Sequence, residues 1–169
     1  MPNAIFFYHI ARWLYLKNVP VLPKMIQGLI FIIYNCHISY LCNIGRKSFL
    51  LHKGMSTLIL DNVIIGENTR IGMNVLITGK APYKNVPRIG NNVWLGPGSI
   101  ISGPVIIEDN VIVAPNSVVN FSVPKNKIVG GIPAKIIGDV RELDYDIFKN
   151  ECFNQEYMEF MEDKRDIKK

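Results

Sequence analysis

The stretch ILDNVIIGENTRIGMNVLI at residues 59–77 repeats one pattern every six residues. An isoleucine opens each repeat, and a small or β-branched residue follows it four positions later. The six-residue register runs on to residue 119, and ten of its eleven positions are aliphatic. These positions are Ile59, Ile65, Ile71, Ile77, Tyr83, Ile89, Leu95, Ile101, Ile107, Val113 and Val119.

A six-residue period with one large and one small inward side chain indicates a short strand and a corner in each repeat. Glycine and asparagine recur near the corners, as at Gly66 and Asn68, and both tolerate the left-handed backbone of tight bends. Three sides close a triangular coil of about 18 residues, and coils stack because one coil cannot bury its apolar side alone. A β-sandwich would show a period of two instead. We therefore predict an all-β solenoid.

Two segments interrupt this register. The earlier aliphatic positions Ile38, Ile44 and Leu50 lie three residues out of phase with Ile59, so we expect a bulge or projecting loop around His52. Between Gly79 and Arg88, lysines and prolines break the strand pattern, which predicts an exposed loop. Such irregular segments are the places where side chains can leave the packed core.

The segments that flank the repeats have helical patterns. Residues 1–35 predict a helical N-terminal cap of two helices, divided by the prolines near residues 18–23. The repeat domain is expected at residues 36–138. Residues 139–169 are expected to form an amphipathic C-terminal helix with a basic tail. The chain thus reads as one solenoid domain between two helical extensions.

Composition narrows the range of functions. The net charge is +5, from 19 basic and 14 acidic residues, and the lysines and arginines are scattered apart from a small cluster in the last few residues. This distribution favours an anionic ligand or surface over specific nucleic-acid binding. Three cysteines, Cys36, Cys42 and Cys152, have no CxxC spacing. They predict buried free thiols in a reducing cytoplasm, with neither a disulfide framework nor a metal site.

No export signal or membrane span is expected. The first ten residues lack a basic start before their apolar positions, unlike a cleavable signal. The apolar run Gly28 to Tyr34 is much shorter than the roughly 20 residues of a spanning helix. We expect a buried or interfacial helix there, and peripheral association with an anionic membrane is a further candidate contact.

Four motifs between Cys36 and Gly138 resemble the hexapeptide-repeat acyltransferases, in particular the serine acetyltransferase branch and its surface-polysaccharide relatives. They are LLHKGM at 50–55, IGENTRIG at 65–72, VPRIGNNVWLG at 86–96 and GGIPAKIIG at 130–138. The resemblance implies a left-handed parallel β-helix, an acetyl-CoA-dependent O-acetyltransferase activity and a homotrimer with each active site at a subunit interface. It also implies that GGIPAKIIG forms the C-terminal coil.

The resemblance places the catalytic general base at His52. Transfer of acetyl from a thioester to a hydroxyl needs a group with a pKa near 6.5 to remove the hydroxyl proton, and histidine is that group. In relatives an aspartate fifteen residues earlier orients the base, whereas this chain has His37. Three alternatives remain for the orienting group: His37, a backbone carbonyl, or a group from elsewhere.

The acceptor is predicted from two departures. Serine-specific relatives carry another histidine where this chain has Val86, and they carry the orienting aspartate where it has His37. Together with the short helical cap, these differences favour a hydroxyl of a saccharide in a surface polysaccharide or its precursor. The alternatives are serine O-acetylation and a β-helix scaffold or binding protein without turnover. A metal-dependent hydratase is disfavoured because it needs more histidines on adjacent coils.

Donor and acceptor contacts complete the expected site. The 18-residue intervals of Gly79, Pro97, Pro115 and Pro133 predict one compact edge, which the resemblance makes a groove for the pantetheine arm together with Ala114. Lys135 is expected to meet coenzyme A phosphates. Trp94 is expected to project outward from a corner, either stacking on a ligand or sealing a subunit contact, and Tyr83 is the second candidate for stacking on a sugar.

Overall fold

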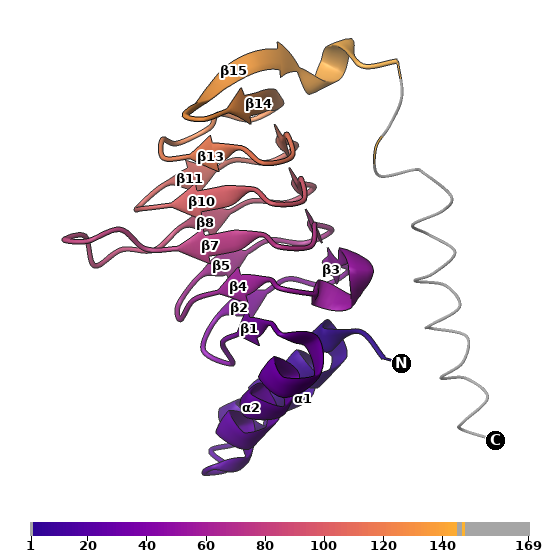
Figure 1. Ribbon diagram of the computed structural model, residues 1–169, viewed down its shortest axis with the longest axis vertical. Helices are drawn as coiled ribbons and strands as arrows, with labels where there is room; N and C mark the ends of the chain where they lie inside the picture. The colour runs from indigo at the N-terminus through magenta and orange to yellow at the C-terminus, as the bar shows by residue number, and fades with distance from the viewer. Residues whose placement is uncertain (1, 145–146, 148–169) are drawn as a thin grey trace.

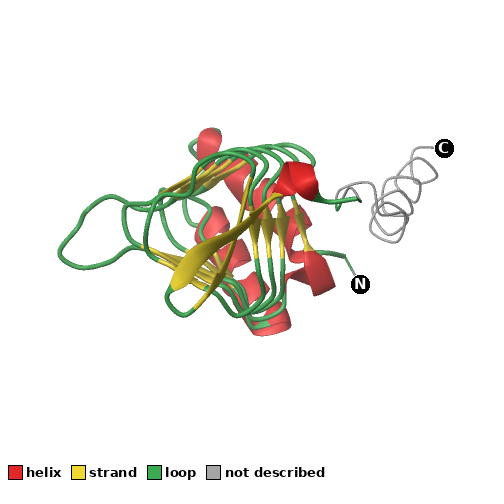
Figure 2. Ribbon diagram, turned by 90° about the horizontal axis from the view of Figure 1, so that it is seen from above, coloured by secondary structure: helices red, strands yellow, loops and turns green. Residues whose placement is uncertain are grey.

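The computed structural model describes residues 2–144 and residue 147. They form a left-handed parallel β-helix whose three sheets make the sides of a triangular prism, with two helices at its N-terminal end (Figure 1). Viewed along the axis, the strands line the sides and the turns gather at the corners (Figure 2). The predicted solenoid is confirmed.

Each sheet collects strands from successive coils, and these strands pair in parallel except for the last pair of sheet C. Sheet A contains β1 (His37–Ile38), β4 (Leu58–Ile59), β7 (Leu76–Thr78), β10 (Ile100–Ser102) and β13 (Val118–Val119). Sheet B contains β2 (Asn43–Ile44), β5 (Ile64–Ile65), β8 (Arg88–Ile89) and β11 (Ile106–Ile107). Sheet C contains β3 (Phe49–Leu50), β6 (Arg70–Ile71), β9 (Trp94–Leu95), β12 (Ile112–Val113), β14 (Lys127–Gly131) and β15 (Ala134–Asp139).

The core is a stack of the aliphatic residues that the register predicted. Ile59, Ile77 and Ile101 follow one another up sheet A and are completely buried. The small positions fill the space at the corners, as Val63, Val75 and others do with 0% exposure. Tyr83 alone leaves this stack, because it lies in the loop at residues 79–87 and is 59% exposed.

Asparagines form the corner between sheets B and C. Asn68, Asn92, Asn110 and Asn126 all have positive φ, between 52° and 63°. Each side-chain amide donates to the side-chain oxygen of the next asparagine, at distances of 2.8, 3.2 and 3.1 Å. Asparagine tolerates the left-handed backbone, and the ladder satisfies its polar atoms between coils.

The helical cap covers the first coil. It consists of α1 (Ala4–Leu16) and α2 (Leu22–Tyr34). The Tyr8 hydroxyl donates to the Cys42 carbonyl at 3.0 Å and accepts from the Ile44 backbone N–H at 3.1 Å. The Asn3 side-chain amide donates to the Leu50 carbonyl at 2.7 Å. These bonds satisfy polar groups of the first coil that would otherwise lack a neighbouring strand.

The C-terminal end differs from the expected coil. β14 and β15 form an antiparallel hairpin, so GGIPAKIIG at 130–138 turns back on itself rather than completing another side. The hairpin strand β15 covers the edge of β14 in sheet C. A further coil would instead end in another unpaired strand edge. After it, a short 3-10 helix (η2) covers Val140–Glu142. The helix expected over residues 139–169 falls almost entirely outside the described residues.

Candidate active site

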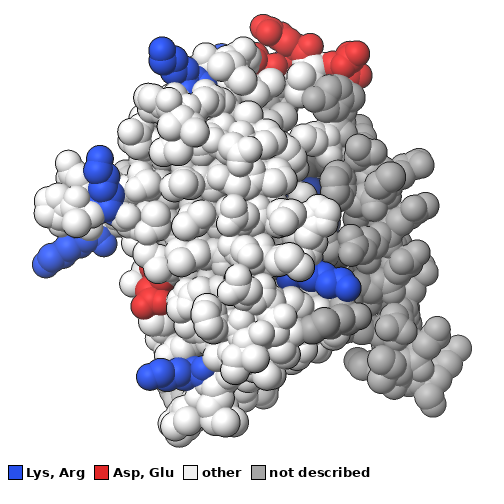
Figure 3. Space-filling view, in the orientation of Figure 1, with Lys and Arg blue, Asp and Glu red and all other residues white. Residues whose placement is uncertain are grey.

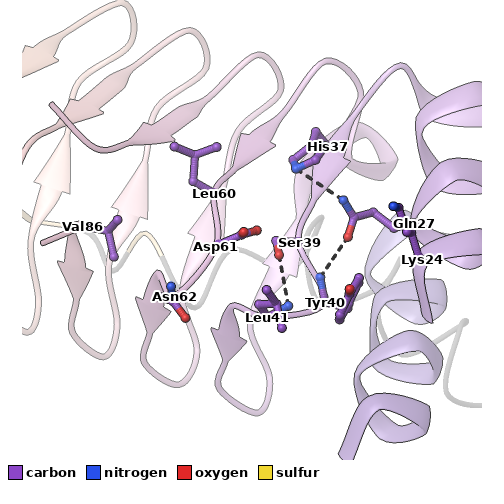
Figure 4. Close-up of a pocket in the computed structure, with 10 residues that line it drawn as sticks. All are labelled: Lys24, Gln27, His37, Ser39, Tyr40, Leu41, Leu60, Asp61, Asn62 and Val86. Atoms are coloured by element: carbon purple, nitrogen blue, oxygen red, sulfur yellow. Dashed lines mark hydrogen bonds between the residues drawn. The ribbon is translucent and has the colours of Figure 1, made fainter. Parts of the chain in front are cut away.

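A pocket of about 490 Å³ lies where the helical cap meets the corner between sheets A and B (Figure 4). The helix α2 contributes two polar residues, the first two coils contribute most of the rest, and one residue comes from the end of the long loop. The lining residues are Lys24, Gln27, His37, Ser39, Tyr40, Leu41, Leu60, Asp61, Asn62 and Val86.

Gln27 holds His37 in this pocket. The Gln27 side-chain oxygen Oε1 accepts from the Tyr40 backbone N–H at 3.3 Å, so the amide nitrogen faces the other way. That nitrogen lies 3.4 Å from His37 Nε2. An amide nitrogen can only donate, so Nε2 accepts and the ring proton resides on Nδ1.

The pocket presents charges of both signs. Lys24 extends from α2, and Asp61 extends toward it from the corner that follows β4 (Figure 4). Both side chains are exposed to solvent. Ser39 between them is buried, and its hydroxyl oxygen accepts from the Leu41 backbone N–H at 3.0 Å. The pocket thus has one cationic and one anionic side chain in its lining, a combination that matches a small zwitterion.

His52 lies at a different corner, between sheets C and A. It belongs to the 3-10 turn η1 (Leu51–Gly54), where His52 and Lys53 have positive φ of 49° and 63°. Leu51 and Gly54 are buried and anchor the turn, while the His52 side chain is exposed. The bulge predicted from the change of register is confirmed.

His37 and His52 are not joined by a hydrogen bond in the described part of the chain, where the ring of His37 pairs with Gln27 instead. His52 does not line the pocket that contains His37. The orienting role of His37 toward the base therefore stays a prediction, and so does the catalytic role of His52.

The long loop brings Val86 to the pocket, so this residue lies near the candidate site as the sequence comparison with serine-specific relatives led us to expect. Val86 packs against the core and lines the pocket wall. Tyr83 stands in the exposed part of the same loop, away from the pocket lining. Val86 thus contributes an apolar wall, and the polar groups of the pocket come from the helix and the first two coils.

The predicted donor edge is only partly formed. Pro97 and Pro115 stack on the corner between sheets C and A, where the Asn116 backbone N–H donates to the Pro97 carbonyl at 2.9 Å. Gly79 follows β7 of sheet A and so lies at the corner between sheets A and B. The loop at 79–87 makes its coil longer than 18 residues, so Gly79 and Pro97 do not share a corner although they are 18 residues apart. Pro133 lies in the turn of the β14–β15 hairpin. The expectation of a single edge through all four residues is wrong.

Ala114 and Lys135 extend the true edge toward the hairpin. Ala114 donates its backbone N–H to the Val129 carbonyl at 2.8 Å, and Gly130 pairs with Lys135 in the antiparallel register. The coils approach closely here, since a Cβ on Gly96 would lie 2.6 Å from the Pro115 nitrogen. Pro97, Ala114, Pro115 and the exposed Lys135 therefore share one side of the solenoid.

Trp94 lies within β9 rather than at a corner. It points away from the core, in register with Arg70 and Ile112. Its indole Nε1 is buried, and no acceptor for it is found among the described residues. The outward direction was predicted correctly, and its contact with a ligand or partner stays a prediction.

The cysteines do not contribute chemistry to this pocket. Cys36 and Cys42 are buried free thiols, as predicted, and burial raises the pKa of each to about 12. Such thiols stay protonated and unreactive at neutral pH. In residues 2–144 and 147, no group of three or more histidine, cysteine or acidic residues comes together as possible metal ligands. Cys152 lies outside the described residues.

Of the residues that line the pocket, the sequence indicated only His37 and Val86, and it missed the polar side chains of Lys24, Gln27 and Asp61. Lys24 and Gln27 belong to the segment interpreted only as a cap, and Asp61 stands at a corner without a distinctive motif. The only available signal was the position of Asp61 two residues after the inward Ile59. Helix docking decides which corner these side chains meet, and no local pattern encodes it.

Sequence comparison connects the repeats to a known family. A model of the bacterial transferase hexapeptide family, with six repeats, matches residues 87–120. The chain is 32% identical over 137 residues to a serine acetyltransferase of Synechococcus elongatus, covering 80% of this chain and 56% of that protein. It is 37% identical over 137 residues to a serine acetyltransferase of Staphylococcus epidermidis, covering 80% of this chain and 64% of that protein.

Solved structures agree with this assignment. A serine acetyltransferase from Brucella abortus in complex with coenzyme A superposes with a TM-score of 0.76 at 28% identity, covering 80% of this chain and 55% of that one. A serine acetyltransferase of Neisseria gonorrhoeae gives a TM-score of 0.76 at 25% identity, covering 81% and 54%. The chain thus spans little more than half the length of these proteins.

The relatives contradict the expected saccharide acceptor and its place in polysaccharide biosynthesis. That expectation rested on Val86, His37 and the short cap, whereas the similarity to serine acetyltransferases extends over 137 residues at 32 to 37% identity. Differences at two positions and the short cap do not outweigh that similarity.

The repeats, the left-handed β-helix and the matched family model agree. Residues 87–120 match the bacterial hexapeptide transferase family, and the chain as a whole is similar to serine acetyltransferases in sequence and fold.

Proposed function

We propose that this protein transfers an acetyl group from acetyl-CoA to the side-chain hydroxyl of serine. The observation that carries the proposal is the 32 to 37% identity to serine acetyltransferases over 137 residues. A related enzyme of 28% identity has been solved with coenzyme A, which supports the same donor here.

The pocket beside His37 supports an amino acid as acceptor. Free serine carries an ammonium and a carboxylate, and a site that recognises it needs a fixed partner for each. Asp61 would meet the ammonium and Lys24 the carboxylate, which the presence of both side chains in the lining of one pocket supports. A neutral sugar would leave this pair of charges without partners.

His52 is the proposed general base. Its ring removes the proton from the serine hydroxyl as the oxygen attacks the thioester carbonyl, and it returns that proton to the departing thiol. The products are O-acetylserine and free coenzyme A. His37 is less suited to this task, since its Nε2 lone pair already accepts from Gln27.

The proposed assembly is a homotrimer that brings the base to the acceptor. His52 and the pocket lie at different corners of one chain, so we propose that His52 of one subunit faces the pocket of the next. The edge of Pro97, Ala114 and Pro115 would then take the pantetheine arm, with Lys135 meeting phosphate groups.

Thiol release from acetyl-CoA tests the function. Serine should stimulate release strongly, with a product heavier than serine by one acetyl group, whereas alanine, which lacks the hydroxyl, should not. A panel of mono- and oligosaccharides serves as the comparison. A rate of thiol release that does not increase when serine is added would overturn the proposal.

A further inference from the structure

The charges of the chain are divided unevenly. Residues 1–60 contain six basic side chains and no acidic one, and the first acidic residue of the chain is Asp61. The basic residues are Arg12, Lys17, Lys24, Arg46, Lys47 and Lys53. The whole net charge of +5 thus arises at the N-terminal end, where the helical cap covers the first coil.

The same cap exposes two apolar stripes. On α2, Leu22, Met25, Leu29 and Ile32 recur at intervals of three, four and three residues and are 45 to 80% exposed. On α1, Ile10, Trp13 and Leu16 recur every three residues, and Trp13 and Leu16 are 59% and 63% exposed. Residues three and four apart share one face of a helix.

Both stripes point away from the solenoid. The buried side chains of α1 include Tyr8 and Ala11, and those of α2 include Ile30 and Tyr34, and helical geometry puts them on the opposite sides from the stripes. A Cβ on Gly28 of α2 would meet no atom within 4 Å. In Figure 3 the end of the molecule that holds the helices shows white and blue atoms and no red ones.

We propose that the α1–α2 cap docks on the surface of a lipid bilayer that contains anionic headgroups. Helices that lie in the membrane interface combine Trp, Leu and Phe on one side with Lys and Arg around them, as this cap does. Anionic lipids attract basic residues near the surface, by about 1 kcal/mol for each one.

Charge distinguishes this occupant from a second copy of the chain. Two copies joined through their caps would bring Arg12, Lys17 and Lys24 of one copy near the same three residues of the other, and the cap segment contains no acidic residue. An anionic bilayer neutralises the same charges while its acyl region accepts the apolar stripes. The charges of the cap therefore favour an anionic bilayer over a second copy of the cap as the binding partner.

The cap is fitted to lie on a bilayer rather than to cross it. Each helix has 13 residues, and such a helix is roughly 20 Å long against a hydrocarbon core of about 30 Å. No helix in the described part of the chain is long and apolar enough to span a membrane.

Vesicle flotation with the full chain tests the proposal. The protein should float with vesicles that contain phosphatidylglycerol and stay behind with pure phosphatidylcholine, and added salt should weaken the binding. Replacing Trp94 with Phe leaves Trp13 as the single tryptophan, whose emission should shift to shorter wavelength on binding.

Matched variants locate the contact. Met25→Asp combined with Ile32→Asp should lower vesicle partitioning by roughly tenfold or more, since two exposed apolar contacts are lost. Lys17→Glu, a milder change, should lower it by roughly fivefold or more. Ile132→Asp and Lys125→Glu, at the far end of the solenoid, should not change it.

Two outcomes would overturn the proposal. One is equal partitioning of wild type and the cap variants. The other is that the wild type does not bind vesicles and that the double variant Met25→Asp, Ile32→Asp sediments more slowly than the wild type. That result would mean that the stripes join copies of the chain. Flotation needs no acetyl acceptor, so failure here leaves the proposed function untouched, and the reverse also holds.

Discussion

Gln27 fixes the tautomer of His37. One end of its amide accepts from the Tyr40 backbone at 3.3 Å, and the other donates to His37 Nε2 at 3.4 Å. A residue from the helical cap thus determines which ring nitrogen of His37, on the first strand of sheet A, accepts a hydrogen bond. The helical cap is therefore part of the candidate site, in addition to closing the end of the solenoid.

Gln27→Glu should reverse this arrangement. A carboxylate has no proton to donate, so His37 Nε2 must carry the proton that the wild type holds on Nδ1. Histidine ¹⁵N NMR distinguishes the two tautomers and should show this change in the variant. Gln27→Leu, which removes both bonds, is the control and should not fix the proton on Nε2.

His52→Ala should leave the fold intact and lower kcat by roughly 100-fold to 10,000-fold, because the proton of the acceptor hydroxyl loses its base. Lys53→Ala, in the same exposed turn, is the matched control and should retain activity. Circular dichroism and thiol release measure the two properties. Near-full activity of His52→Ala would show that another group removes the proton.

Subunit mixing should reveal whether the site is shared. If base and pocket come from neighbouring subunits of a trimer, random mixing of His52→Ala with Asp61→Asn chains restores both groups at about a quarter of the sites. Each variant alone should be nearly inactive at low serine. Sedimentation checks that mixed trimers form. A mixture that gains no activity would place base and pocket in the same chain.

Lys24→Met and Asp61→Asn should each raise the KM for serine by roughly tenfold or more, because one end of the zwitterion loses its charged partner. The KM for acetyl-CoA should change little, since the proposed donor edge lies on another corner. Lys125→Met, exposed at the far end, is the control. An unchanged KM for serine in both variants would mean that the pocket is not the acceptor site.

Substitutions of Asn92 should separate backbone strain from the asparagine ladder. Asn92 has φ of 52° and takes part in two ladder hydrogen bonds. Both variants lose the bonds, but Asn92→Gly also removes the Cβ from the left-handed region whereas Asn92→Ala keeps it, so the alanine variant should be less stable than the glycine variant by about 1–2 kcal/mol. Denaturant unfolding at equal protein concentration measures both. Equal stability of the two variants would contradict this account.

Asp139 should make the stability of the hairpin depend on acid. Arg141 and Lys127 donate to its carboxylate and hold its pKa well below the usual range. A depressed folded-state pKa gives stability that is present above the unfolded pKa of about 4 and lost as the pH falls below it. Asp139→Asn should therefore flatten the loss of thermal stability between about pH 4 and pH 2. An unchanged acid profile would contradict this role.

The sequence by itself determined the solenoid. A side chain that returns to the core every six residues permits only a short strand and a corner per repeat, so Ile59 to Val119 predicted the three sheets and their buried stack. The register break before Ile59 located the turn of His52, and the asparagines marked the left-handed corners. These features are local, and local spacing encodes them.

Only the tertiary structure decided which side chains meet. The loop at 79–87 adds residues without adding a side, so counting by 18 placed Gly79 on the edge of Pro97 when it lies at another corner. The docking of α2 brings Lys24 and Gln27 to His37 and Asp61. Such contacts depend on how whole elements pack across long sequence separations, which no repeat spacing specifies.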